Sequence, residues 1–238
     1  MALEVEDDER QREREVPSGL RAVLFDFDGT LAPSLPLWLE AYHIALRTFS
    51  VTLTDTEVLQ RCFFRDWADV AADLGVCTAI ELQVEVDRGL QQSFAAAELF
   101  PLARDVIEHC REQGLRTALV TSSPRRLIDT VAAKLDVHHL FDFVICGCEV
   151  TNYKPHPEPV LRTLQALDCA PRAAIMIGDS AADILAGKAA GTRTALFMPD
   201  DHHRFHDSER LRATEPDFIF REHGELSSLL GLSPRGRD

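Results

Sequence analysis

Apolar and polar positions alternate in a regular way along most of the chain. Short apolar runs are separated by longer segments whose apolar residues recur at helical spacing. The runs predict strands, and the spaced segments predict helices between them. The predicted strands are 21–25, 115–120, 141–146, 173–177, 194–197 and 217–220, and the predicted helices are 103–113, 157–167, 181–190, 224–230 and one directly after Pro124. This alternation predicts an α/β fold, a parallel sheet with helices on both faces.

The segment 36–98 interrupts this alternation. It has helical spacing throughout and no convincing strand, with helices expected at 37–49, 54–63, 67–74 and 79–94. Proline breaks flank it, at 32–36 and at Phe100-Pro101. We therefore expect an inserted helical domain at 36–98, a core made of 19–35 and 99–238, and a disordered acidic tail at 1–18.

The first predicted strand runs directly into two carboxylates, Asp26 and Asp28, and Gly29 follows them. In open parallel sheets, ligands bind outside the carboxyl ends of the strands. Two acids held this close repel each other unless a cation or a shared proton intervenes. The arrangement suits a metal-bound carboxylate beside a second acid. The simpler alternative is an Asp-Gly turn whose two acids are solvated.

Three further polar clusters fall at or just beyond predicted strand ends. They are Thr121 with Ser122, Lys154, and Asp179 with Asp183. Each has a simple explanation when taken alone: a helix cap, an exposed lysine in a loop, and a turn with a capping residue. Their joint occurrence in an alternating fold favours a common site.

The order and spacing of these clusters resemble the motifs of the haloacid dehalogenase-like superfamily of hydrolases. The chain carries D-F-D-G-T-L from Asp26, T-S at Thr121, K-P at Lys154 and G-D-S-A-A-D from Gly178. The similarity extends from about Arg21 to the end of the chain. It implies a Rossmann-like parallel-sheet core, with the helical insert as an α-helical cap domain.

The resemblance also assigns catalytic roles. Asp26 is implied as the nucleophile that forms an aspartyl-phosphate, and Asp28 as the general acid and base. The Thr121 hydroxyl and the Ser122 backbone N–H are implied to bind the phosphoryl oxygens. Lys154 supplies a local positive charge between nucleophile and phosphate.

A Mg²⁺ ion is the implied cofactor. The resemblance gives it three ligands: the Asp26 side chain, the Asp28 backbone carbonyl and the Asp179 carboxylate. Oxygen ligands are what this ion prefers. Asp183 is expected either to lie behind these ligands and support them or to act as an auxiliary ligand.

Two features of the sequence narrow the reaction within the superfamily. Members that cleave carbon–halogen bonds lack an acid at the position of Asp28, so this residue favours phosphoryl transfer. Segment 36–98 contains no lysine, which argues against the phosphonate hydrolases that use a cap lysine. Pro33 precedes Ser34 where relatives often carry an acid, which weakens any assignment to a subfamily.

The leading hypothesis is a Mg²⁺-dependent phosphatase for a small phosphorylated metabolite, similar to phosphoglycolate phosphatases. One alternative is a sugar-phosphate mutase of the β-phosphoglucomutase type. Another, from a different class, is a non-catalytic binding or scaffold protein on the same fold. Substrate choice is expected to lie in the insert. Its candidate residues are Trp38, Tyr42, His43, Arg47, Arg61, Arg65 and Trp67.

Composition excludes several other classes. The net charge of −14 argues against a nucleic-acid-binding surface. The same charge repels a small anionic substrate, so a site for one needs a local cation. No apolar run approaches the ~18 residues of a membrane span, and no apolar signal-peptide core precedes residue 18. The six cysteines contain no C-x-x-C pair, so reduced thiols in a cytoplasmic protein are expected. The sequence gives no oligomeric state.

Overall fold

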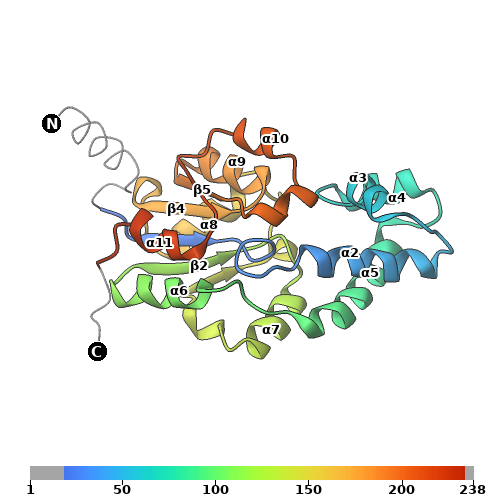
Figure 1. Cartoon of the computed structure of the whole chain (residues 1–238), viewed down its shortest axis with the longest axis horizontal. Coiled ribbons are helices and arrows are strands. Elements are labelled where there is room, and N and C mark those ends of the chain that lie inside the picture. Colours follow the sequence, from blue (N-terminus) through green and yellow to red (C-terminus); the bar gives the residue numbers. More distant parts are fainter. Residues whose placement is uncertain (1–18, 234–238) are drawn as a thin grey trace.

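The computed structural model describes residues 19–233, which contain a six-stranded parallel sheet (Figure 1). The sheet order is β3-β2-β1-β4-β5-β6, and every adjacent pair is parallel. The strands are β1 (Ala22–Phe25), β2 (Arg116–Val120), β3 (Phe143–Ile145), β4 (Ala174–Gly178), β5 (Arg193–Phe197) and β6 (Phe218–Phe220). The predicted α/β class is confirmed. The tail expected at 1–18 lies outside the described residues.

Helices connect the strands of the core, and one more follows the last strand. They are α6 (Ala103–Glu112), α7 (Arg125–Lys134), α8 (Glu158–Ala166), α9 (Ala181–Ala190), α10 (Ser208–Arg212) and α11 (His223–Leu229). Short 3₁₀ turns also occur: η2 (His138–Leu140), η3 (Gly147–Glu149), η4 (Pro171–Ala173) and η5 (Asp200–Arg204). The sequence predicted no element between β5 and β6, where η5 and α10 lie. Within 19–233, no helix is long and apolar enough to cross a membrane.

The sheet is buried on both faces, which is why its strands appear as continuous apolar runs. All four residues of β1 are fully buried. Val23 and Phe25 belong to the core cluster that contains the apolar residues of α6, α7 and α11. Ala22 and Leu24 belong to the cluster that contains those of α8 and α9. Two helical layers therefore hold β1 in place, together with the residues that follow it.

The helices of the insert lie beyond one end of the sheet (Figure 1). They are α2 (Leu35–Thr48), α3 (Asp55–Arg61), α4 (Trp67–Leu74) and α5 (Ala79–Ser93), followed by the 3₁₀ turn η1 (Phe94–Ala96). Thr54 and Thr78 each form a capping box, which starts α3 and α5. A Cβ atom on Gly89 of α5 would lie 2.6 Å from the backbone oxygen of Ala41. A glycine therefore lets α2 and α5 pack closely.

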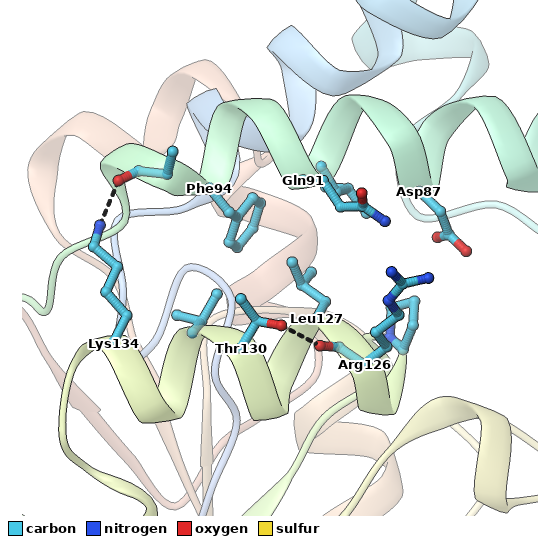
Figure 2. A pocket seen from close by; sticks show the side chains of 11 residues that line it. Asp87, Gln91, Phe94, Arg126, Leu127, Thr130 and Lys134 are labelled. Atoms are coloured by element: carbon cyan, nitrogen blue, oxygen red, sulfur yellow. Dashed lines mark hydrogen bonds between the residues drawn. The ribbon is translucent and has the colours of Figure 1, made fainter.

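The chain enters and leaves the insert at adjacent points. The Phe100 backbone N–H donates to the Leu31 carbonyl, at 2.9 Å. Lys134 of α7 donates to the carbonyl oxygens of Ala95 and Ala97, at 2.5 and 2.9 Å. Figure 2 shows this lysine at one end of a cavity of about 440 Å³ between α5 and α7. The exit segment of the insert is thus fixed to the core by a charged side chain.

A buried histidine links the exit segment to the last helix. His223 of α11 is 3% exposed, and its ring packs against Phe100, Phe197 and Phe220, with centroid separations of 5.8, 4.7 and 6.1 Å. Its Nε2 atom has no hydrogen-bond partner among the described residues. Burial lowers the pKa of His223 from 6.5 to about 4. The fold therefore holds this ring neutral.

We predict that His223 makes the fold sensitive to acid. In the unfolded chain, His223 binds a proton below its ordinary pKa. In the folded chain, it binds that proton only near its lowered pKa. Stability is therefore lost as the pH falls, by about 2 kcal/mol between about pH 6.5 and about pH 5. His223→Phe should remove this share, as measured by urea unfolding at about pH 7 and about pH 5. His138→Phe, at an exposed position, is the control and should keep the wild-type pH dependence. A His223→Phe variant that is equally sensitive to acid would contradict the prediction.

Candidate active site

The sheet order brings three strand ends together. β1 lies between β2 and β4, at the point where the strand order reverses, which is where open α/β sheets bind ligands. Asp26 directly follows β1, and its backbone N–H donates to Ile177 of β4 at 2.9 Å. Thr121 directly follows β2, and Asp179 directly follows β4. The hydrogen bonds of the sheet thus set the positions of these side chains.

A cavity of about 440 Å³ opens at this edge, between the core and the insert. Most of the residues predicted for the site line it: Asp26, Asp28, Thr121, Ser122, Lys154 and Asp179. Asp183 is fully buried and does not line the cavity. The structure therefore brings the four sequence clusters together, with Asp183 beneath the cavity floor.

Lys154 is the buried cation of the site. Its side chain is 3% exposed, and its Nζ atom donates to Asp26 Oδ1 at 2.9 Å, Asp183 Oδ1 at 2.6 Å and the Val120 carbonyl at 2.8 Å. Burial lowers the pKa of Lys154, but the charges of Asp183 and Asp26 outweigh it and the net shift is upward. The lysine therefore stays protonated, and all three of its donors are used.

Asp183 holds this lysine from below. Its Oδ1 atom accepts from Lys154, and its Oδ2 atom accepts from the Ser180 backbone N–H at 3.1 Å and from the Ser180 hydroxyl at 2.6 Å. These contacts also form the capping box that starts α9. A Cβ atom on Gly178 would lie 2.2 Å from the Asp183 side chain, so that position leaves no room for a larger residue. Asp183 is thus fixed by the strand and helix on either side of it.

Three carboxylates lie close together at this edge of the sheet, and Lys154 contacts two of them. Oxygen atoms of Asp26, Asp179 and Asp183 all lie within 4.8 Å of one another. Burial raises the pKa of Asp26 well above its usual value; Asp183 and Asp179 add to the increase, and Lys154 opposes it. A divalent cation bound by oxygen atoms would balance this negative charge, so the residues present fit Mg²⁺. Gly29 makes room, because a Cβ there would lie 2.1 Å from Asp179 Oδ2.

Asp28 has separate partners. Its Oδ1 atom accepts from the Ser34 hydroxyl at 2.6 Å and from Trp38 Nε1 at 2.8 Å, and its Oδ2 atom accepts from the Ser123 hydroxyl at 2.5 Å. Burial raises the pKa of Asp28, although these three donors partly oppose it. Asp26 and Asp28 thus occupy different environments although they are two residues apart.

Sequence reasoning missed several of these contacts. Ser34 and Ser123 were not assigned to Asp28, and no role was given to His202 or His206. Ser34 and Trp38 are four residues apart at the start of a helix. His202 and His206 are also four residues apart in sequence. That spacing places side chains on one face of a helix and is a signal in each case.

Four of the seven candidates in the insert line the cavity: Trp38, Tyr42, Arg65 and Trp67. The other three, His43, Arg47 and Arg61, do not. His43 instead contacts Asp55 at 2.9 Å, and Arg61 contacts Asp73 at 2.8 Å. Among the three candidate arginines, Arg65 is the one that lines the cavity, and its guanidinium also donates to the Arg61 carbonyl at 2.8 Å and lies 3.6 Å from Asp73.

The insert also contacts the core across the cavity. The Phe63 ring stacks on Phe205, with centroids 6.1 Å apart, and the Phe64 ring lies 4.8 Å from His206. Phe63 and Phe64 both line the cavity. The segment between α3 and α4 therefore covers this side of the cavity.

Comparison with known proteins gives the family. The model of the family described as haloacid dehalogenase-like hydrolase matches residues 23–197, from β1 to the end of β5. The chain belongs to this family.

Two curated relatives match this chain over almost their whole length. A phosphoglycolate phosphatase from Salmonella paratyphi A is 30% identical over 240 residues, covering 90% of this chain and 93% of the relative. Pyrophosphatase PpaX from Anoxybacillus flavithermus is 28% identical over 221 residues, covering 91% and 99%. The crystal structure of a putative phosphoglycolate phosphatase from Lactobacillus plantarum is similar in fold. It has a TM-score of 0.77 at 21% identity, and the match covers 89% of this chain and 99% of that one.

We predict that Lys154→Met strongly destabilises the fold. The substitution leaves Asp26 and Asp183 buried without their cation, which costs about 3–5 kcal/mol of unfolding free energy. Urea unfolding in the presence of EDTA measures the loss. Lys188→Met is the matched control. Its Nζ atom donates to the Thr214 carbonyl at 2.7 Å near the surface, so it should lose at most about 1 kcal/mol. Equal losses in the two variants would show that the carboxylates do not depend on Lys154.

Proposed function

We propose that the protein is a Mg²⁺-dependent phosphatase that hydrolyses a small phosphomonoester through an aspartyl-phosphate on Asp26. The observation that carries this proposal is the pairing of two acids in different environments. Asp26 lies beside a buried ammonium group at the cavity floor, and Asp28 is held apart by three neutral donors. One carboxylate is suited to attack and the other to transfer protons.

The reaction has two halves. In the first, the Asp26 carboxylate forms a bond to phosphorus as the ester P–O bond breaks, and Asp28 gives its proton to the leaving oxygen. In the second, Asp28 takes a proton from water, which attacks the aspartyl-phosphate and releases inorganic phosphate. The raised pKa of Asp28 suits a group that must carry a proton first. Thr121 and Ser122, which line the cavity, are proposed to bind the phosphoryl oxygens.

Mg²⁺ is proposed to bind to the carboxylates of Asp26 and Asp179 and to the backbone carbonyl of Asp28. When bound, it would offset the negative charge of the phosphoryl group and of the nucleophile. Asp183 is proposed as a positioning residue, because both of its oxygens are already engaged by Lys154 and Ser180. Lys154 itself is proposed to stabilise the same negative charge from the other side.

The insert is proposed to act as a cap that selects the substrate. We place its limits at 36–98, as the proline breaks predict. The cavity of about 440 Å³ suits a small metabolite, and Arg65, which lines it, is proposed to contact a second anionic group. Phosphoglycolate, the substrate in the name of the Salmonella relative, has such a group, a carboxylate. We also propose a cytoplasmic enzyme, since all six cysteines are free thiols.

Two alternatives remain for the experiment to separate. A mutase of the β-phosphoglucomutase type would share the four motifs and return the phosphoryl group to a sugar instead of to water. A non-catalytic scaffold needs no charged site. Asp26, Lys154 and Asp183 form one buried network, which argues against a scaffold. Burying charges costs free energy that a scaffold has no reason to spend.

We predict that a panel of phosphorylated metabolites will reveal Mg²⁺-dependent release of phosphate. EDTA should abolish it, and added Mg²⁺ should restore it. Asp26→Asn should remove turnover and the aspartyl-phosphate together. Arg65→Ala should change the preference among anionic substrates, whereas Arg47→Ala, which is outside the cavity, should not. Full turnover after exhaustive chelation would overturn the proposal, and sugar-phosphate isomerisation without phosphate release would favour the mutase.

We further predict that Asp28→Asn discriminates between leaving groups. An alkoxide needs a proton to leave, whereas p-nitrophenolate leaves with little help. The loss of kcat should therefore be about 10²-fold or more for an alkyl phosphate and much smaller for p-nitrophenyl phosphate. Ser34→Ala, which removes one donor to Asp28, is a milder companion variant. Equal losses on both substrates would mean that Asp28 is not the general acid.

A further inference from the structure

Two histidines lie against Asp179, the carboxylate that the proposed Mg²⁺ site also uses. His206 Nε2 is 2.9 Å from Asp179 Oδ2, and His202 Nδ1 is 3.8 Å from the same oxygen. Both come from the segment after β5, where the His206 backbone N–H donates to the His202 carbonyl. One helical turn therefore places both rings on the same face.

His202 has an unsatisfied nitrogen. The residue is 4% exposed, and its Nδ1 atom has no hydrogen-bond partner within the described part of the chain. The rings of Phe100 and Phe197 pack beside it, with centroids 6.0 and 5.7 Å away. A separation of 3.8 Å from Asp179 is too long for a hydrogen bond. Leaving such a polar atom buried and unpaired costs free energy, so a ligand for this nitrogen would stabilise the fold.

The spacing of the three groups fits ligands of one metal ion. In a tetrahedral site with bonds of about 2.0–2.2 Å, two ligand atoms lie about 3.3–3.6 Å apart. The two observed separations from Asp179 Oδ2, 2.9 and 3.8 Å, bracket this range, and all three ligand atoms lie within 4.8 Å of one another. Phe64 of the insert covers the His206 ring, at a centroid distance of 4.8 Å.

We propose that Asp179, His202 and His206 form a second metal site, selective for Zn²⁺ over Mg²⁺. Two imidazole nitrogens and one carboxylate are ligands that Zn²⁺ accepts, whereas Mg²⁺ prefers oxygen alone. The site shares Asp179 with the proposed Mg²⁺ site but differs in its other ligands. Whether this second metal site exists does not depend on the proposed phosphatase activity. One consequence is that Zn²⁺ bound here engages Asp179 Oδ2, so it should reduce any activity that needs Asp179 for Mg²⁺.

The test is calorimetric titration of the full-length protein with Zn²⁺ in a large excess of Mg²⁺, with no substrate present. Wild type should bind one Zn²⁺ that Mg²⁺ does not displace. His206→Gln should weaken this binding by at least about tenfold, and so should His202→Phe, whose ring suits the aromatic surroundings. His203→Ala is the matched control, since that residue lies in the same turn, is exposed, and places its ring against the Asp200 carbonyl rather than against Asp179. The exposed thiol of Cys148 is present in all four proteins, so its contribution cancels.

A second readout reports the ligands directly. Co²⁺ bound by imidazole in a four-coordinate site absorbs visible light strongly. Wild type and His203→Ala should show this spectrum in excess Mg²⁺, and His206→Gln should lose it. Equal Zn²⁺ binding in wild type and His206→Gln, or no Zn²⁺ binding by wild type in excess Mg²⁺, would overturn the proposal. His206 would then act only as a hydrogen-bond partner of Asp179. Failure of the phosphatase assay leaves both titrations unchanged.

Discussion

The buried ammonium group of Lys154 is the contact on which the site depends. It joins the strand end that carries Asp26 to the helix start that carries Asp183, and it also contacts the end of β2 through the Val120 carbonyl. Carboxylates this close would repel one another without it. Because the lysine is almost fully buried, its charge is screened little by solvent. One side chain thus allows three segments of the sheet edge to meet.

At the same edge of the sheet, Asp26 and Asp28 are close in sequence but lie in different chemical environments. Asp26 and Asp28 leave the same strand two residues apart, yet one lies among charges and the other among hydroxyl and indole donors. The backbone turns from Phe27 onward, where the Thr30 and Leu31 N–H groups donate to the Phe27 carbonyl, and Gly29, with φ of 73°, follows Asp28 and leaves space for Asp179. A strand alone would present both acids in the same direction. The tight turn gives them different neighbours.

Much of this arrangement is readable from the sequence. The apolar run of β1, followed at once by Asp26, indicates a buried strand that ends at a ligand site, and the parallel sheet then brings Asp179 to the same edge. The contacts of Asp28 could not be predicted in this way. Its partner Ser123 is 95 residues away in sequence, and only packing brings the two together. The segment 200–212 was missed because its Asp, His and Arg residues conceal the few apolar positions that pack inward.

The hydrogen bond between Phe100 and Leu31 has a consequence for how such proteins vary. The two ends of the helical insert are adjacent. An insert that is shorter, longer or replaced could therefore start and end at the same two points without changing the core sheet. Insertions are tolerated best where entry and exit lie side by side at the surface. The core and the insert can therefore change at different rates over evolution. If the insert selects the substrate, as proposed, new selectivity can arise by exchange of the insert while the charged sheet edge stays as it is.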